Sequence, residues 1–370
     1  MKIVIQNNSR VWGGNEKWLA TLAAGLAARG HRVVVSCRAK GPVRRELERR
    51  GIATTSVRPG GYADVVRGLR FRRWLKGERP DVLLLTSWRT TPWGAWAARR
   101  AGVPRTVVRL GIVRTLRPGR RDAWPFRGRV DALIVNSPAV RDAWLRTAPW
   151  FPADEVHLVL NGVPAAPPLS DAERAAVRAE LGLSADAAVI VGAGRLSRRK
   201  GFDYLLDAFA RAGIPGSEVL LVGTGEEEAN LRAQASALGI ADRVRFAGER
   251  GDVPRVLGAC DLFVLSSQNE GMANVMLEAM AAGIPVAAFD VSGVRDALGP
   301  RDARPAAGWI VPPADADALA AALRDALANP DDAAARVAEA SWRVRNWFSI
   351  DRMVDEAEAV LRGRRPENGT

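Results

Sequence analysis

Two glutamates eight residues apart are the side chains best placed to act together on a ligand. Glu270 and Glu278 lie in the segment Glu-Gly-Met-Ala-Asn-Val-Met-Leu-Glu, which follows an apolar run at 262–265. The run predicts a buried strand, so we expect Glu270 in the loop at its carboxyl end and Glu278 in the second turn of the next helix, facing one cleft. The first N–H groups of that helix favour an anion such as a diphosphate. Carboxylates near a helix start are also favourable without a ligand, so the pair alone leaves both interpretations open.

A basic loop framed by glycines is the second candidate. It runs from Gly194 to Gly201 with the sequence Gly-Arg-Leu-Ser-Arg-Arg-Lys-Gly, between a strand pattern and a helix pattern. We expect Arg195 and Lys200 to converge on one pair of phosphates, where fixed positive charge would stabilise a nucleoside diphosphate as it leaves. The intervening Arg198 and Arg199 are expected to be solvated. An ordinary surface loop has the same composition, so this motif is also weak by itself.

Two glycine turns complete the set. Gly13 and Gly14 follow the first strand pattern, and Gly223 and Gly225 follow the pattern at 219–222. Glycine lets a backbone approach a phosphate closely, but plain turn chemistry explains both pairs equally well. The first pair also lacks the GxGxxG spacing of a dinucleotide-binding fold.

The elements that must position these residues are alternating strands and helices. Continuous apolar runs separated by helical patterns predict parallel sheets covered on both faces, with ligands at the carboxyl ends of the strands. The alternation stops at the Pro- and Gly-rich segment 161–168 and then restarts, which predicts two Rossmann-like doubly wound domains. We therefore expect an N-terminal acceptor-side domain at 1–165, a nucleotide-sugar-binding domain at 166–340, and a helix at 341–362 that crosses back to the first domain. The runs lie at 3–5, 33–35, 82–85, 106–108 and 132–135, and then at 188–191, 219–222, 243–246, 262–265 and 285–288.

Composition excludes several classes of protein. The 370 residues are 48% hydrophobic and 26% charged, as in globular proteins. No apolar run reaches the roughly 18 residues of a membrane span, and the first residues become polar too early for a signal peptide, so we expect a cytoplasmic protein. Two isolated cysteines, Cys37 and Cys260, and two distant histidines, His31 and His157, give no disulfide framework, metal cluster or Ser-His-Asp triad.

Positive charge is concentrated in the first domain. Residues 1–165 contain 31 Lys and Arg against 11 Asp and Glu, whereas the remainder contains 23 against 30, and nine of the twelve tryptophans also lie in the first part. Basic residues mixed with tryptophan are typical of contact with an anionic membrane surface, with nucleic acid as the less favoured partner. A general excess of arginine is an equally simple explanation. The candidate clusters are Arg44-Arg45, Arg70 to Trp74, and Arg114 to Arg129.

Taken in chain order, these motifs resemble those of the family-4 retaining glycosyltransferases of GT-B fold. The resemblance covers nearly the whole chain, and the Glu-x7-Glu segment with its Ala-Met-Ala-Ala-Gly continuation is its most specific part. It implies two Rossmann-like domains facing across a cleft, transfer from a nucleoside-diphosphate sugar with retained anomeric configuration, and no metal or other cofactor. It also implies roles for individual residues: Arg195 and Lys200 hold the diphosphate, Glu278 the ribose, Glu270 the donor sugar, and the backbone of Glu249 and Arg250 the base. With Glu270, Arg195 and Lys200 as catalytic residues, the implied binding set is Gly13, Gly14, Arg109, Gly194, Arg195, Lys200, Gly225, Glu249, Arg250, Glu270, Gly271, Met272, Ala273, Asn274, Val275 and Glu278.

The sequence departs from the family pattern at three places. Leu110 stands where members often carry a histidine, and Arg109 is a candidate substitute, although a structural role for this arginine is the simpler expectation. Pro164 replaces a frequent acid, and Asp296 replaces a more usual glutamate. Asp315-Ala316-Asp317 looks like a metal-binding Asp-x-Asp, but its position before an Ala/Leu-rich helix predicts a helix cap.

These observations favour a glycosyltransferase that uses a glycan or lipid-linked acceptor in cell-surface polysaccharide or glycolipid biosynthesis. It would be cytoplasmic or peripheral on the inner face of the membrane. Two alternatives stay open: a nucleotide-sugar epimerase or phosphorylase of the same fold, and a basic binding protein without activity. The base, the sugar, the acceptor and the linkage do not follow from the sequence.

Overall fold

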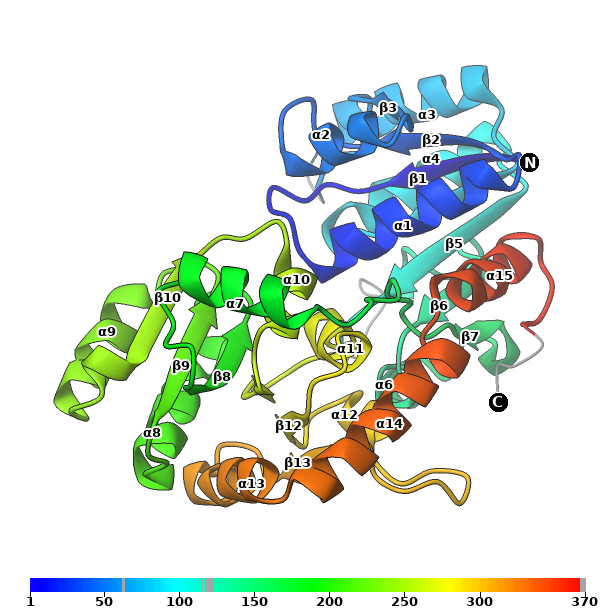
Figure 1. Ribbon diagram of the computed structural model, residues 1–370. Helices are drawn as coiled ribbons and strands as arrows, with labels where there is room; N and C mark the ends of the chain where they lie inside the picture. Colours follow the sequence, from blue (N-terminus) through cyan, green and yellow to red (C-terminus); the bar gives the residue numbers. More distant parts are fainter. Residues whose placement is uncertain (62–63, 115, 117–122, 367–370) are drawn as a thin grey trace. The chain divides into compact units, whose positions relative to one another are not determined.

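The chain folds into two α/β units. The computed structural model describes residues 1–370 except 62–63, 115, 117–122 and 367–370 (Figure 1). The N unit comprises Met1–Gly162 and Ile350–Thr370, and the C unit comprises Val163–Ser349. The division thus falls at Gly162, three residues before the expected end of the first domain.

The N unit is built on a seven-stranded parallel sheet in the order β3-β2-β1-β4-β5-β6-β7. All four residues of β4 and of β6 are buried, because helices cover both faces of the sheet, which explains the uninterrupted apolar runs of the sequence. The strands are β1 (Lys2–Gln6), β2 (Arg32–Ser36), β3 (Ala53–Thr55), β4 (Val82–Leu85), β5 (Arg105–Leu110), β6 (Ala132–Val135) and β7 (Val156–Leu158). The helices are α1 (Gly14–Ala28), α2 (Pro42–Arg49), α3 (Val65–Glu78), α4 (Thr91–Ala101), α6 (Pro138–Thr147) and α15 (Ile350–Leu361), with short 3-10 turns at Trp88–Thr90 and Ala153–Glu155.

The C unit repeats this plan with six parallel strands in the order β10-β9-β8-β11-β12-β13. Its core joins apolar residues of α8 and α13 to the central strands, among them Phe209, Leu221 and Leu323. The strands are β8 (Ala188–Ala193), β9 (Ser217–Val222), β10 (Val244–Gly248), β11 (Leu262–Leu265), β12 (Val286–Phe289) and β13 (Trp309–Val311). The helices are α7 (Asp171–Glu180), α8 (Phe202–Ala212), α9 (Glu228–Ala237), α10 (Val253–Gly258), α11 (Asn274–Ala281), α12 (Val294–Leu298), α13 (Ala316–Ala328) and α14 (Pro330–Trp347), with 3-10 turns at Arg198–Lys200 and Ala241–Arg243.

The expected single helix at 341–362 is two helices. Helix α14 ends at Trp347 and α15 begins at Ile350, so the break falls at Phe348 and Ser349. Phe348 is fully buried, and its carbonyl oxygen accepts the N–H of Val163 at 2.9 Å, a backbone bond that a continuous helix would not allow. The helix after the break belongs to the N unit, where it packs on α1 so closely that a Cβ at Gly25 would lie 2.6 Å from Val354.

Candidate functional site

The centre of the candidate site in the C unit is a largely buried ion pair. The ammonium nitrogen of Lys200 lies 2.7 Å from Oε1 of Glu270, and the two side chains are only 14% and 10% exposed. Lys200 ends the turn after β8, and Glu270 lies in the loop after β11. These strands are neighbours in the sheet, so their carboxyl ends bring the two loops together.

Backbone contacts fix the loop that carries Lys200. Gly201 has φ of 61° and starts α8, and a Cβ there would lie 2.1 Å from the carbonyl oxygen of Ser266. The hydroxyl of Ser266 donates to the carbonyl oxygen of Lys200 at 3.1 Å, and the N–H of Gln268 donates to that of Arg199 at 2.9 Å. The left-handed backbone and the close approach together require glycine at position 201.

Arg199 joins the same carboxylate, although we expected it to be solvated. Its Nη1 lies 3.4 Å from Oε2 of Glu270 and donates to the carbonyl oxygen of Asn269 at 2.7 Å, while half of its side chain stays exposed. Burial would raise the pKa of Glu270, but the positive charges of Lys200 and Arg199 outweigh burial and hold this pKa below its ordinary value. Glu270 is therefore a carboxylate at neutral pH.

Arg195 is committed to a different partner. Its guanidinium pairs with the carboxylate of Glu226 at 3.0 Å, and both side chains are more than half exposed. The structure therefore directs Arg195 and Lys200 to separate carboxylates rather than to one point. An exposed pair of this kind is weak, so a bound phosphate can replace Glu226 as the partner of Arg195.

The glycines of the two neighbouring turns interlock. A Cβ at Gly223 would lie 1.9 Å from the carbonyl oxygen of Gly194, and one at Gly225 would lie 2.1 Å from that of Leu196. The N–H of Leu196 also donates to the carbonyl oxygen of Thr224 at 3.0 Å. Packing of one turn on the other is thus a sufficient reason for glycine at 223 and 225.

Helix α11 places Glu278 as expected, in its second turn and buried. Its N-cap residue is Ala273, which has no side-chain oxygen to accept the N–H groups of the first turn. The preceding Gly271 and Met272 are buried, and the carbonyl oxygen of Gly271 accepts the hydroxyl of Ser292 at 3.3 Å. A ligand oxygen can take the position of the missing cap at Asn274 and Val275.

A second polar cluster lies at the carboxyl edge of the N-unit sheet. Arg109, buried at the end of β5, donates to Oδ1 of Asn15 at 2.7 Å and to Oδ1 of Asn161 at 3.1 Å, and it stacks on Trp18 at 4.2 Å. Burial lowers its pKa to about 10, against the opposing charge of Glu16. The neighbouring Leu110 is also buried.

This cluster contains residues that sequence reasoning missed. Gly13 is the N-cap of α1 and Gly14 its first residue, so the predicted glycine turn leads directly to Asn15. Asn15 follows the glycine pair, and Asn161 begins the Pro- and Gly-rich segment 161–168. Their places beside these motifs were the only sign in the sequence that the two asparagines could belong to a site. Their convergence on Arg109 depends on the order of strands in the sheet.

Comparison with known proteins identifies the family. A model described as Glycosyltransferase Family 4 matches residues 12–166, and one described as Glycosyl transferases group 1 matches residues 173–342. The chain is 30% identical over 329 residues to the lipopolysaccharide core biosynthesis glycosyltransferase LpsE of Rhizobium meliloti (strain 1021). The alignment covers 86% of this chain and 86% of LpsE. The chain belongs to the family of glycosyltransferases that these two models describe.

Two further relatives support the assignment of family and fold. The glycosyltransferase is 30% identical over 285 residues to LpsD, a lipopolysaccharide core biosynthesis glycosyltransferase of the same organism, with 76% of each chain covered. The solved structure of Anabaena HepE in complex with UDP-glucose matches with a TM-score of 0.84 at 23% identity, covering 98% of this chain and all of that one. The predicted GT-B class with two Rossmann-like domains is confirmed.

The predicted base-binding segment of the glycosyltransferase follows β10. Glu249 is exposed, whereas the guanidinium of Arg250 pairs with Asp252 at 2.9 Å and with Glu180 at 2.6 Å. Hydrogen bonds to these two carboxylates raise the pKa of Arg250. Because the side chain of Arg250 is engaged within the C unit, its backbone is better suited than its side chain to contact a base.

The Asp-x-Asp sequence of the glycosyltransferase is a helix cap, as predicted. Asp315 is the N-cap of α13, and its carboxylate accepts the N–H of Ala318 at 2.9 Å. Asp317 pairs with Arg211 at 2.8 Å. Across the described residues, no three His, Cys, Asp or Glu side chains gather in a way that could hold a metal ion.

The tryptophans of the N unit differ widely in their exposure to solvent. Trp18 and Trp144 are buried in the core, and Trp124 is exposed, with Arg129 stacked over its ring at 4.5 Å. The third basic cluster, 114–129, lies partly outside the described residues, because 115 and 117–122 are not among them. None of the described helices has the length and apolarity needed to cross a bilayer.

Proposed function

We propose that this chain is a retaining glycosyltransferase that needs no metal or other cofactor and transfers a sugar from a nucleoside-diphosphate sugar to a glycan or lipid-linked acceptor. In the reaction, the bond from the anomeric carbon to the diphosphate oxygen breaks and a bond to an acceptor hydroxyl oxygen forms. The nucleoside diphosphate and the hydroxyl proton are released.

The buried pair of Lys200 and Glu270 is the observation that carries this proposal. A compact cation and a carboxylate are held 2.7 Å apart at the carboxyl edge of a parallel sheet, next to a helix start without a side-chain cap. Such a site offers positive charge and N–H groups to a diphosphate and a carboxylate to sugar hydroxyls.

We propose for the site residues the roles that the family resemblance implies. Lys200 and Arg195 hold the diphosphate together with the N–H groups of Asn274 and Val275, and the backbone turns at Gly194 and Gly225 adjoin it. Glu270 accepts hydroxyl groups of the donor sugar, and Glu278 accepts those of the ribose. The backbone of Glu249 and Arg250 contacts the base. In the N unit, Gly13, Gly14 and Arg109 belong to the acceptor side.

The acceptor is proposed to come from cell-surface polysaccharide or glycolipid biosynthesis, because LpsE and LpsD are named for lipopolysaccharide core biosynthesis. The enzyme would work in the cytoplasm, with its basic N unit against the anionic inner face of the membrane. Residues 1–165 contain 31 basic and 11 acidic residues, and this excess of positive charge supports the contact.

A donor panel tests the proposal. Thermal shift of the full chain with UDP, GDP, ADP and their sugars should select one nucleotide, since binding to the native state raises its apparent stability. NMR of the glycoside made from the selected donor should show the donor's anomeric configuration, and the same turnover is expected in EDTA. An inverted product, or epimerised donor without transfer, would contradict the proposal. No response to any donor would favour a binding protein.

A further inference from the structure

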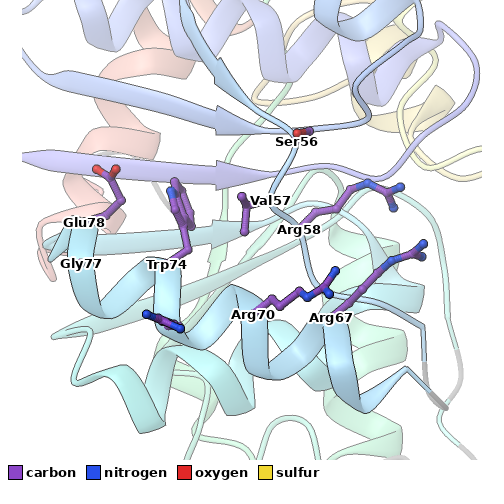
Figure 2. A pocket seen from close by; sticks show the side chains of 9 residues that line it. Ser56, Val57, Arg58, Arg67, Arg70, Trp74, Gly77 and Glu78 are labelled. Carbon is purple, nitrogen blue, oxygen red and sulfur yellow. The ribbon is translucent and has the colours of Figure 1, made fainter.

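A pocket of about 600 Å³ lies along α3 of the N unit, apart from the polar cluster around Arg109. One wall is the segment after β3, and the other is one face of the helix. Figure 2 shows Arg58, Arg67 and Arg70 pointing to the same side, with Trp74 beside Val57. The lining residues are Ser56, Val57, Arg58, Arg67, Arg70, Arg73, Trp74, Gly77 and Glu78.

The described residues neutralise the positive charge of the pocket only in part. Its one acid, Glu78, pairs with Lys2 at 2.6 Å. Arg67 pairs with Asp64 at 3.2 Å, but within the described part of the chain no carboxylate pairs with Arg70 or Arg73. Four arginines thus face one cavity, and among the residues that the structure describes only Asp64 forms an ion pair with one of them.

On the opposite wall, Arg58 forms no ion pair with a carboxylate of the described residues. Its Nη1 donates to the neutral amide oxygen of Asn8 at 2.7 Å. Burial lowers the pKa of Arg58, and the charges of Arg38 and Arg67 lower it further, against the opposing charge of Asp64. A bound anion would relieve this repulsion.

The helix also exposes aliphatic side chains beside the arginines. Gly68, Phe71 and Leu75 form its buried face, so the opposite face looks outward. On that face Val66 is 60% exposed and Leu69 is 47% exposed, at helical spacing from Arg70 and Arg73. An outward face that mixes arginine with valine and leucine suits the boundary between headgroups and hydrocarbon of a bilayer.

We propose that this arginine pocket binds the phosphate group of an anionic lipid, with Val66 and Leu69 in contact with the adjoining apolar layer. Several guanidinium groups can share one phosphate through charge-assisted hydrogen bonds, and the apolar wall of Val57 and Trp74 accommodates the carbon atoms next to it. The inference rests on the membrane contact in the proposed function and gives that contact a specific site.

Vesicle sedimentation of the full chain tests the site. We compare vesicles of phosphatidylcholine with and without phosphatidylglycerol. The wild type should prefer the anionic vesicles, and the double variant Arg70→Gln/Arg73→Gln should bind them roughly thirtyfold more weakly, because each basic residue at the surface contributes about fivefold. The control Arg324→Gln/Arg345→Gln removes the same charge from exposed positions of the C unit and should change binding by less than roughly twofold.

A further variant and a soluble probe distinguish an error in the membrane contact from an error in the pocket assignment. Val66→Ser/Leu69→Ser should weaken vesicle binding without changing its salt dependence, because only the apolar contact is lost. If the wild type shows no preference for anionic vesicles, both the membrane contact and the pocket assignment fail, whereas donor binding is untouched. If the pocket and control variants lose the same affinity, the pocket assignment fails and the membrane contact remains. If glycerol 3-phosphate binds the pocket and vesicles do not, the ligand is a soluble phosphate and the lipid assignment is overturned.

Discussion

The ammonium nitrogen of Lys200 and the carboxylate of Glu270, 70 residues apart in the chain, form an ion pair of 2.7 Å with almost no exposure to solvent. The pair ties the turn after β8 to the loop after β11. Removing only one member of a buried ion pair costs much stability, because the remaining charge stays shielded from water and has lost its partner. The same groups therefore have a structural role and a proposed role toward the donor, and experiments must separate the two.

A double-mutant cycle measures the structural role. Lys200→Met should lower the free energy of unfolding by about 3 kcal/mol, the lower end for breaking a buried pair, because Arg199 still faces Glu270. Lys200→Met/Glu270→Gln should recover most of this loss, giving a coupling energy of about 1–3 kcal/mol in urea denaturation. The cycle of Arg195→Met and Glu226→Gln, an exposed pair, is the control and should give less than about 1 kcal/mol. Equal coupling in the two cycles would contradict the distinction.

The stability of the native state should depend on pH through Glu270. Its pKa is lower in the folded chain than in the unfolded chain, so its contribution is fully present above the ordinary glutamate pKa of about 4.3. The contribution is lost as pH falls through the lower, folded-state pKa. The difference in unfolding free energy between wild type and Glu270→Gln should accordingly be constant from neutral pH to about pH 5 and shrink below it. A difference that begins to shrink near neutral pH would show that the folded-state pKa is raised.

The two glutamates should affect different parts of the donor. Glu278→Gln is expected to weaken free nucleoside diphosphate roughly tenfold to a hundredfold, as when a charge-assisted hydrogen bond is lost. Glu270→Gln should leave that affinity nearly unchanged and lower the rate of transfer from the intact donor. Glu249→Gln is the control for both, since only its backbone is assigned a contact. Equal losses from both variants with nucleotide and with nucleotide sugar would show that the roles are not divided in this way.

The longer strands were predictable, and the three shortest strands were not. The run at 82–85 coincides with β4, because a strand buried on both faces must be apolar throughout. β3, β7 and β13 lie at sheet edges and have only three residues each, so their sequences contain no comparable run. The break at Phe348 was missed for a related reason: it depends on a backbone bond to Val163, far away in the sequence.

The candidate site was predictable as a set of segments but not as a set of contacts. The spacing of Glu270 and Glu278 placed them correctly on a loop and in a helix, because each position depends on local structure. The partners of Arg195 and Arg199 depend on how neighbouring turns pack, and sequence spacing carries no such information. The result is that Arg199 faces Glu270 and Arg195 faces Glu226, contrary to expectation.

The glycines at the two ends of α8 give a matched test of the loop that carries Lys200. Gly201 and Gly213 both have φ of 61°, but a Cβ would meet the carbonyl oxygen of Ser266 at 2.1 Å at the first and open space at the second. Gly213→Ala should therefore lower the free energy of unfolding by about 1–2 kcal/mol, because alanine is strained in the left-handed backbone conformation. Gly201→Ala should cost roughly 1–3 kcal/mol more from the overlap and should also weaken nucleoside diphosphate binding. Equal unfolding free energies for the two variants would contradict the close contact.

The last prediction concerns Arg109, the candidate substitute for the histidine that Leu110 replaces. Its guanidinium joins Asn15 to Asn161 and stacks on Trp18, so we expect it to stabilise the turn at the start of α1. Arg109→Met should lower the free energy of unfolding by about 2–3 kcal/mol, because the amide oxygens of Asn15 and of the buried Asn161 lose a charged donor. Nucleotide binding, which we assign to the C unit, should be preserved.

Arg109→Lys separates stability from activity at the same position. Lysine keeps the charge but cannot bond both asparagines in the planar arrangement of arginine, so it should recover only part of the stability lost in Arg109→Met. If Arg109 acts mainly through the turn, transfer activity in the two variants should fall in the same order as their stability. A lysine variant as stable as wild type that has lost transfer but not donor binding would contradict this expectation. That result would instead mean that the guanidinium contacts the substrate directly.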